Sequence, residues 1–144
     1  SSDRDWRVEN QAEGAILVDR QRITEAMMNL AQNAVQHTVA GNIIRLGSNL
    51  ERDRVLFWVR DTGAGIPPAE QTRIFERFAR VMNTRRRSDG SGLGLAIVKA
   101  IVEAHDGSVR LQSHLGTGST FILVLPINCS ESVLHHVSNS YRRR

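Results

Sequence analysis

The sequence predicts a two-layer α+β sandwich, in which a mixed and mostly antiparallel sheet is covered by helices on one face. Its elements are expected in the order strand, helix, hairpin, short helix, long loop, helix and hairpin. Because the strands come largely in adjacent pairs, this order argues against a Rossmann fold, which requires repeated alternation of strand and helix. With 144 residues, 40% of them hydrophobic and 24% charged, the chain is long enough for one domain with a core.

The first part of the chain is expected to form two short strands and an amphipathic helix. The strands are predicted at residues 6–9 and 15–18, where apolar side chains gather. A helix is predicted from near Gln21 to residues 38–41, since apolar residues recur there at spacings of three and four. That apolar stripe consists of Ile23, Ala26, Met27, Leu30, Ala31 and Ala34.

The middle of the chain predicts a hairpin, a second helix and a long loop. Residues 42–50 and 54–60 read as strands joined by the polar link 51–53. Two prolines then precede a segment, residues 69–78, that is expected to be helical because proline suits the first turn of a helix. Residues 79–91 are rich in arginine and lack a period, so they are predicted to form a long mobile loop of the kind that often acts as a lid.

The last part predicts a helix and a second hairpin. Residues 96–105 are apolar on most sides and are expected to form a buried helix, ended by Asp106 and Gly107. The hairpin is predicted from two strands and a glycine turn, residues 108–113, 119–125 and 116–118. Residues 127–144 are polar and without period, so we expect a folded domain over 1–126 followed by a disordered tail.

Charge and composition argue against several classes of partner. The net charge is +4, with arginine runs at 85–87 and 142–144. A solvated loop and tail explain these runs better than a nucleic-acid surface, because no aromatic residues lie among the arginines. No apolar run reaches the roughly 20 residues that span a bilayer, and the first ten residues do not resemble a signal peptide. The single cysteine, Cys129, cannot form an internal disulfide or a cysteine metal cluster, so a cytoplasmic location is expected.

The strongest chemical signal is the segment from Asp61 to Ile66, which follows an apolar strand. A carboxylate at the end of a strand can accept a hydrogen bond from an exocyclic amine such as that of adenine. Gly63 and Gly65 allow positive φ and let a ligand approach without a Cβ in the way. The alternative is an ordinary surface turn, since Asp, Thr and Gly all favour turns.

Two further segments fit the same ligand. The glycine-rich residues 90–95 open into a helix, where free backbone N–H groups and the positive end of the helix dipole suit phosphate. They do not match a P-loop, because no Lys-Ser or Lys-Thr follows the last glycine. On the first helix, Asn29, Asn33 and His37 are spaced four apart on one side. An Asn oxygen can share Mg²⁺ with phosphates, although a hydrogen-bonded residue on an exposed helix face is the alternative for Asn33.

Taken together, these segments resemble the ATP-binding catalytic domain of two-component sensor histidine kinases, within the superfamily that also holds gyrase, the heat-shock chaperone and MutL. The resemblance runs from about Trp6 to Pro126 and implies the Bergerat ATP-binding fold. The N box, first glycine box, F box, second glycine box and closing glycine-Ser/Thr segment are matched in order by residues 29–34, 61–66, 74–78, 90–95 and 116–121.

The resemblance implies a role for each matched residue. Asn33 would hold Mg²⁺, Asp61 would accept the adenine amine, and Arg77 would reach a phosphate oxygen or anchor the ATP lid. The other nucleotide-binding residues would be His37, Gly63, Gly65, Ile66, Phe75, Gly90, Ser91, Gly92, Leu93, Gly94, Leu95 and Thr120. Ser119 is the alternative to Thr120 on the adenine side. Gln36 occupies a place where the family often has Lys, so one positive charge near the phosphates is missing.

The same resemblance leaves three functions open: phosphotransfer from ATP to a histidine, ATP hydrolysis, and nucleotide binding without turnover. Hydrolytic relatives carry a Glu one turn before the Mg²⁺-binding Asn, where it acts as a general base for water. Here that position is Asn29, which cannot take a proton at neutral pH. The sequence therefore favours the kinase, with Asn29 counted among the catalytic positions.

The phosphoacceptor histidine is expected on another domain. In the family it is followed by an acidic residue and, about five residues later, by Pro, and His105-Asp106 lacks that Pro. The implied partners are the dimerisation and histidine-phosphotransfer domain of a parent kinase and, through that parent, a response regulator. We expect no nucleic acid and no membrane contact by these residues, whose parent can itself be anchored in the inner membrane.

Overall fold

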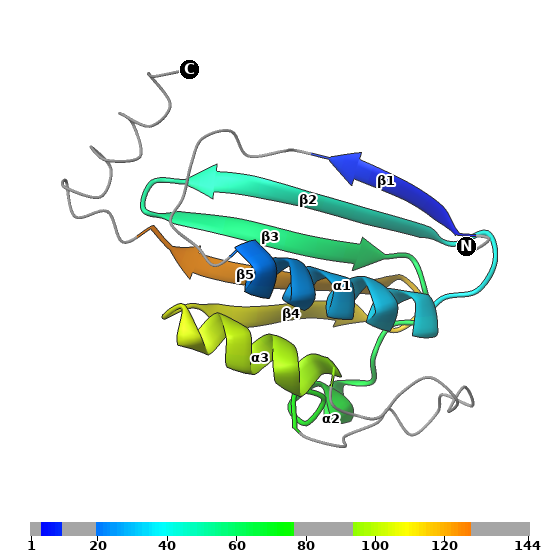
Figure 1. Cartoon of the computed structure of the whole chain (residues 1–144). Coiled ribbons are helices and arrows are strands. Elements are labelled where there is room, and N and C mark those ends of the chain that lie inside the picture. Colours follow the sequence, from blue (N-terminus) through cyan, green and yellow to red (C-terminus); the bar gives the residue numbers. More distant parts are fainter. Residues whose placement is uncertain (1–3, 10–19, 77–93, 128–144) are drawn as a thin grey trace.

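The structure is a computed structural model that describes residues 4–9, 20–76 and 94–127. Within these residues a five-stranded sheet is covered on one face by two long helices (Figure 1). The elements are β1 (Asp5–Glu9), α1 (Arg20–Gln36), β2 (Ile43–Glu51), β3 (Arg54–Asp61), α2 (Pro68–Gln71), α3 (Gly94–Ala104), β4 (Ser108–His114) and β5 (Gly118–Pro126). The predicted α+β sandwich is confirmed.

The strands lie in the order β1-β2-β3-β5-β4. Strand β1 pairs in parallel with β2, and the other three pairings are antiparallel. The sheet is therefore mixed and mostly antiparallel, as predicted. The order also makes β3 and β5 central neighbours, so the end of β3 lies against the beginning of β5. No helix among the described residues is long and apolar enough to cross a membrane.

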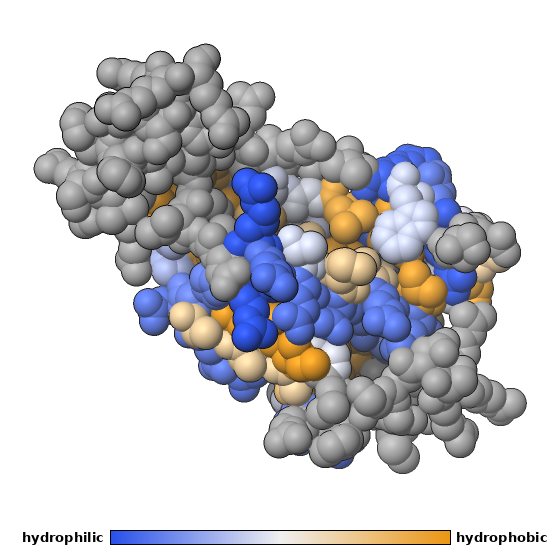
Figure 2. Space-filling model, viewed as in Figure 1, coloured by the Kyte–Doolittle hydropathy of each residue, from blue (hydrophilic) through white to orange (hydrophobic). Residues whose placement is uncertain are grey.

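Helix α1 forms because its apolar residues repeat at helical spacing, and four of them are buried against the sheet and α3. These are Ile23, Ala26, Leu30 and Ala34. The helix ends where Thr38 Oγ1 donates to the Ala34 carbonyl at 2.7 Å, which satisfies one of the last carbonyls of the helix. The outer surface of α1 is mainly hydrophilic (Figure 2). The predicted helix is confirmed, although it ends at Gln36 rather than near residues 38–41, and Met27 and Ala31 of the predicted stripe are only half-buried.

The hairpin of β2 and β3 is tighter than predicted. Glu51 and Arg54 pair across it, so the connection is the two residues Arg52 and Asp53 rather than three. The Arg54 Nε lies 2.7 Å from Glu51 Oε2.

On the face of the sheet opposite the helices, the Arg60 guanidinium lies over the ring of Trp58, 5.5 Å from its centroid.

Two helix predictions need correction. The predicted helix over 69–78 is only Pro68–Gln71, and it is followed by turns in which the N–H of Arg73 and of Glu76 bonds the carbonyl three residues earlier. The helix predicted over 96–105 begins earlier, at Gly94, and is buried on one side only. Its residues Lys99, Ala100 and Glu103 are exposed, because a two-layer fold covers only the side that faces the sheet and α1.

Helix α3 ends at the predicted pair, but Asp106 rather than the glycine takes the left-handed conformation, with φ +60°. The Gly107 N–H then bonds the Val102 carbonyl at 2.9 Å, as in a Schellman motif. Glycine is required at 107 for another reason, since a Cβ there would collide with the Val124 carbonyl.

Beyond β5, the Ile127 N–H bonds the Asp53 carbonyl at 2.7 Å. The predicted strand 15–18, all of the predicted loop 79–91 and residues 128–144 lie outside the described residues.

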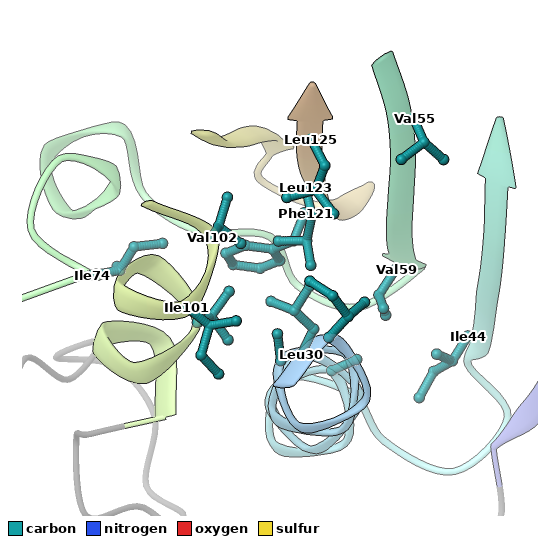
Figure 3. Packing of buried hydrophobic residues seen from close by; sticks show 14 of the residues in the cluster. Leu30, Ile44, Val55, Val59, Ile74, Ile101, Val102, Phe121, Leu123 and Leu125 are labelled. Carbon is teal, nitrogen blue, oxygen red and sulfur yellow. The ribbon is translucent and has the colours of Figure 1, made fainter. Parts of the chain in front are cut away.

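The core lies between the sheet and the two long helices (Figure 3). Side chains of β3 and β5 point toward α1 and α3, and Phe121 is 1% exposed. The Phe75 ring packs edge-on against Phe121, with centroids 6.0 Å apart and planes at 80°. Burying each such large side chain contributes about 1.5–3 kcal/mol. The core thus fixes the relative positions of α1, α3 and the ends of β3 and β5.

Candidate functional site

Asp61 is the last residue of β3 and is only 3% exposed. It pairs with Ser119, the second residue of β5, so both share the side of the sheet that faces the helices. Its Oδ1 accepts the N–H of Gly63 at 2.9 Å. The predicted carboxylate at a strand end is therefore present, held in place by the backbone that follows it.

The environment of Asp61 raises the pKa of its carboxyl group. Burial is the largest cause, since it disfavours the charged form. The Gly63 N–H, the charge of His37 and the backbone N–H of Ser119 lower the pKa in turn, but they do not outweigh burial. A buried, incompletely compensated carboxylate gains from a further hydrogen-bond donor. The N–H group of a bound amine is such a donor.

The two glycines after Asp61 are required by close backbone contacts. A Cβ on Gly63 would collide with the His37 carbonyl at the end of α1. Gly65 has φ +79°, and a Cβ there would collide with the His114 carbonyl at the end of β4. Within the described residues both glycines let the loop pack between α1 and β4, and the expectation that they also leave room for a ligand ring stays a prediction.

A hydroxyl that the sequence analysis missed holds this loop to the sheet. Ser113 Oγ accepts the N–H of Ile66 at 2.8 Å, donates to the Gly118 carbonyl at 3.2 Å and lies 2.8 Å from Ser119 Oγ. Gln71 Nε2 donates to the Ile66 carbonyl at 2.9 Å. Alternation along β4 could have revealed Ser113, because it follows two partly buried residues, Val109 and Leu111, at spacing two.

Thr62 and Asn42 anchor the other side of the loop. The Thr62 N–H bonds the Ile43 carbonyl at 3.1 Å, and Thr62 Oγ1 accepts the Ile43 N–H at 2.9 Å. Asn42 Nδ2 donates to the Thr62 carbonyl at 3.1 Å. The segment from Asp61 to Ile66 is therefore fixed on both sides before any ligand binds.

The polar row of α1 runs from the beginning of α3 to this loop. Asn29 Nδ2 donates to the Glu25 carbonyl at 3.0 Å, and its Oδ1 would lie 3.3 Å from a Cβ on Gly94. His37 lies at the other end, beside Gly63. The eight intervening helical steps cover roughly 12 Å. Asn33 lies midway, half-buried, and its side-chain amide bonds none of the described residues.

His37 presents one ring nitrogen that has no partner. Its Nδ1 lies 2.9 Å from the Asn33 carbonyl oxygen, which can only accept, so Nδ1 carries the hydrogen. Nε2 is buried and makes no hydrogen bond within the described part of the chain. In the neutral ring Nε2 is an acceptor, and a buried acceptor without a partner costs free energy. Together with Asp61, it marks this end of the row as a place for a ligand with hydrogen-bond donors.

Several predicted site residues lie away from the site in the structure. Ile66 is 1% exposed and lies in the core, and Phe75 packs on Phe121. Thr120 pairs with Arg60 and accepts from its Nε at 3.2 Å, so its side chain lies on the opposite face from Asp61. This corrects the expectation for Thr120 in favour of the alternative Ser119, because successive residues of a strand point to opposite faces.

The second glycine box is described only at its end. Gly94 begins α3 beside Asn29, and Leu95 is partly buried against the core. The other predicted residues of this group, Arg77, Gly90, Ser91, Gly92 and Leu93, lie outside the described residues. The described site therefore holds the buried carboxylate of Asp61, the polar row of α1 and the first residue of α3.

Comparisons with known proteins agree with this arrangement. Residues 18–128 match the family described as histidine kinase-, DNA gyrase B-, and HSP90-like ATPase. The chain is 42% identical over 112 residues to the sensor-like histidine kinase SenX3 of Mycobacterium tuberculosis, a match that covers 77% of this chain and 27% of SenX3. The chain thus spans about a quarter of the length of this curated relative.

Solved structures give the same assignment. The mycobacterial sensor histidine kinase MprB matches with a TM-score of 0.76 and 30% identity, covering 86% of this chain and 84% of that chain. The histidine kinase ThkA, in complex with the response regulator protein TrrA, matches with a TM-score of 0.70 and 28% identity, covering 87% and 34%. The chain therefore belongs to the histidine kinase-, DNA gyrase B-, and HSP90-like ATPase family, as an ATP-binding domain of the sensor histidine kinase type.

Proposed function

We propose that this chain binds ATP together with Mg²⁺ and directs the γ-phosphoryl group to a histidine on a separate dimerisation domain. The observation that carries the proposal is the pairing of a buried carboxylate, Asp61, with the polar row of α1 that ends beside it. Asp61 would recognise the base, and the polar row of α1 leads from that base toward the beginning of α3. The family, which is named for its ATPases, supports the nucleotide.

On the base side, the Asp61 carboxylate accepts a hydrogen bond from the exocyclic amine of adenine. Its carboxylate is already oriented by the Gly63 N–H, so little reorganisation accompanies binding. When its ring is neutral, His37 offers Nε2 as a second acceptor nearby, since the Asn33 carbonyl holds the hydrogen on Nδ1. The contrast with guanine is direct, because guanine presents a carbonyl oxygen where adenine presents the amine.

On the phosphate side, Asn33 is the residue that fits Mg²⁺. Its side-chain oxygen is a hard ligand on a half-buried helix face, and no described residue already binds its amide. Mg²⁺, when bound there, supplies positive charge that offsets the charge of the phosphates. Gly94, at the beginning of α3, lies beside Asn29 at the other end of the polar row, where the helix adds the positive end of its dipole.

Transfer to a histidine is favoured over hydrolysis by Asn29. This side chain donates to its own helix at the Glu25 carbonyl and is neutral, so it cannot act as a general base for water. Transfer to a histidine depends less on a general base, because the imidazole nitrogen is itself the nucleophile. That nitrogen forms the bond to the γ-phosphorus while the bond to the bridging oxygen breaks and ADP leaves.

The acceptor histidine belongs to a partner domain, and a response regulator is the further partner of the parent kinase. ThkA has been solved in complex with a response regulator protein, which supports the same class of partner for the parent of this chain. The matched relative SenX3 is also much longer than the present chain, which leaves room for a dimerisation domain in such a parent.

A two-part experiment tests the proposal. In the first part, ATP and GTP are titrated into the chain with and without Mg²⁺, and we expect binding of ATP that Mg²⁺ strengthens. In the second, labelled ATP is mixed with the chain and with the parent's helical dimerisation domain as a separate polypeptide. Acid-labile label should appear on that domain, and Asn33→Ala should abolish it while leaving the fold intact. Full transfer by Asn33→Ala would refute the role of Asn33, and label that never appears on the partner would refute the kinase.

A further inference from the structure

We propose that Arg4 is a positioning residue for nucleotide binding, which acts by holding the C-terminal end of α1 against the loop that follows Asp61. Arg4 precedes β1 and lies 34 residues from Thr38 in the sequence. None of the motifs that identify the family includes it. The inference rests on the proposed function, because it explains how the site is held ready for ATP.

The contacts of Arg4 are concentrated on the last turn of α1. Its Nε donates to Thr38 Oγ1 at 3.0 Å, and its Nη2 donates to the carbonyls of Val35 at 2.9 Å and of Thr38 at 2.7 Å. The last carbonyls of a helix have no partner within the helix and carry the negative end of its dipole. A guanidinium supplies both charge and several donors in a fixed fork, and such charge-assisted bonds are roughly twice as strong as neutral ones.

The segment that Arg4 holds is the one that contacts the glycine loop. His37 lies between Val35 and Thr38, and its carbonyl is in contact with Gly63. The Gly63 N–H in turn bonds Asp61 Oδ1. A shift of the end of α1 would therefore displace the donor that orients the carboxylate, and it would also move His37 Nε2.

The beginning of β1 reaches the same loop by a second route. The Asp5 N–H bonds the Asn42 carbonyl at 3.0 Å, while Asn42 Nδ2 donates to the Thr62 carbonyl. Asn42 Oδ1 accepts the N–H of Val39 at 2.8 Å, just past the end of α1. Arg4 and Asp5 thus tie the start of β1 to both sides of the loop, although neither bonds Asp61 in the described structure. A displacement of Arg4 or Asp5 would therefore be passed to the nucleotide site through these bonds.

Arg7 provides a matched control. It lies three positions further along, in β1, and its guanidinium pairs with the exposed Asp5 carboxylate, with Nη2 2.8 Å from Oδ2. Arg4→Gln and Arg7→Gln remove the same charge from the same part of the chain, but the first removes three bonds to the end of α1, while the second removes the ion pair with Asp5. Arg4→Lys keeps the charge and loses the fork.

The test measures ATP affinity by calorimetry at a temperature where every variant is folded, together with the amide resonance of Gly63 by NMR. We expect Arg4→Gln to weaken ATP binding by about three- to tenfold, the usual range for a residue that acts on a site without touching its ligand. Arg7→Gln should stay within about twofold of the wild type. Arg4→Lys should recover part of the affinity. In the absence of nucleotide, the Gly63 resonance should shift in Arg4→Gln and not in Arg7→Gln.

Each outcome decides between a positioning role and a structural one. Unchanged ATP affinity and an unchanged Gly63 resonance in Arg4→Gln would overturn the inference, and so would equal effects of Arg4→Gln and Arg7→Gln. If Arg4→Gln does not fold, Arg4→Lys carries the same two measurements, and a Gly63 resonance identical to the wild type would overturn the inference. If the wild type binds no ATP, the proposed function fails, while the resonance shift without nucleotide still tests whether Arg4 positions the loop.

Discussion

Asp61 is a carboxylate that the fold buries before any ligand arrives. Because burial raises the pKa of Asp61, the folded state holds its proton more tightly than the unfolded state does. The free energy of unfolding that this group contributes is therefore present below its ordinary pKa and is lost as the pH rises through the raised value. Once ionised, the buried side chain lowers the free energy of unfolding.

Asp61→Asn should separate these two effects. Its amide oxygen can still accept the Gly63 N–H, so we expect the free energy of unfolding at pH 7 to be unchanged or higher. ATP affinity should fall by about 1.5–3 kcal/mol, the worth of a hydrogen bond to a charged group. Urea unfolding at pH 7 and calorimetry with ATP measure the two quantities. A variant that loses stability and keeps its ATP affinity would contradict the assignment.

Wild-type affinity for ATP should also fall as the pH is lowered through the raised pKa of Asp61, because the protonated carboxyl accepts the amine less well. The Asp61→Asn variant provides the control, since it has no proton to gain at this position. Calorimetry at several acidic pH values, all within the range where both proteins remain folded, tests this. Parallel pH profiles of the two proteins would show that another group is responsible.

Ser113→Ala should lower the free energy of unfolding by about 1–3 kcal/mol, because it leaves the buried Ile66 N–H without its acceptor. Thr117→Ala is the matched control, since Thr117 Oγ1 is exposed and bonds only the nearby His114 carbonyl in the same turn. Urea midpoints of the two variants make the comparison. Equal losses would mean that the Ser113 hydroxyl has no special part in holding the loop.

At this scale the sequence predicts residue types well and their surroundings less well. The position of Asp61 at a strand end could be predicted because an apolar run, residues 55–59, precedes it. The sequence does not decide between Thr120 and Ser119, because the face that a strand residue occupies depends on where the turn ends, and a shift of one residue reverses it. Gly63 and Gly65 were recognised as special, but their close contacts with α1 and β4 join distant segments, which local sequence does not reveal.

At the scale of elements, the end of α3 makes a sharp prediction. Asp106 has φ +60°, a conformation that costs free energy for a residue with a Cβ. Asp106→Gly should therefore raise the free energy of unfolding by about 0.5–1 kcal/mol. Glu103→Gly, which removes the same charge from an exposed position within α3, should lower it by about 1 kcal/mol. Thermal unfolding of both variants tests the pair, and a shift of the same sign in both would contradict it.

The long helices and the hairpins could be predicted because their periodicity spans many residues. Helix α2 was predicted too long, since helical propensity continues past Gln71 while the structure does not. Gln71 bonds the Ile66 carbonyl and Phe75 packs on Phe121, so tertiary contacts favour turns over a continued helix there. Burial of α3 was overestimated for a related reason, because an apolar side chain such as Ile97 does not need to be covered.

At the scale of the whole molecule, the sandwich could be predicted and the order of its strands could not. The parallel pairing of β1 with β2 joins strands separated by α1, and the insertion of β5 between β3 and β4 joins segments more than 50 residues apart. Such pairings are set by the shape of the shared core rather than by local signals. They also create the site, because Asp61 meets Ser119 only when β3 and β5 are neighbours.

The molecule as a whole is expected to bind ATP without turning it over quickly. Self-labelling needs an acceptor histidine, and His105, the one followed by an acid, lies just past the end of α3 and lacks the downstream proline of the family's acceptor site. Rapid hydrolysis needs a base, and the neutral Asn29 lies where that base would be, beside Gly94. Labelled ATP incubated with the chain alone should therefore persist, with neither acid-labile label on the protein nor fast release of phosphate.

Asn29→Glu tests the last point directly, with Asn29→Gln as its control. Both side chains are one methylene longer than Asn, so both disturb the contact with Gly94 to a similar extent. Only Glu can accept a proton from water, and an evolved general base contributes about 10²–10⁴-fold. We expect a slow but measurable rise in phosphate release for Glu, well below that range because nothing else aligns the water, and no rise for Gln. Equal rates for the two variants, or fast hydrolysis by the wild type, would place the chain among the hydrolytic members of its family.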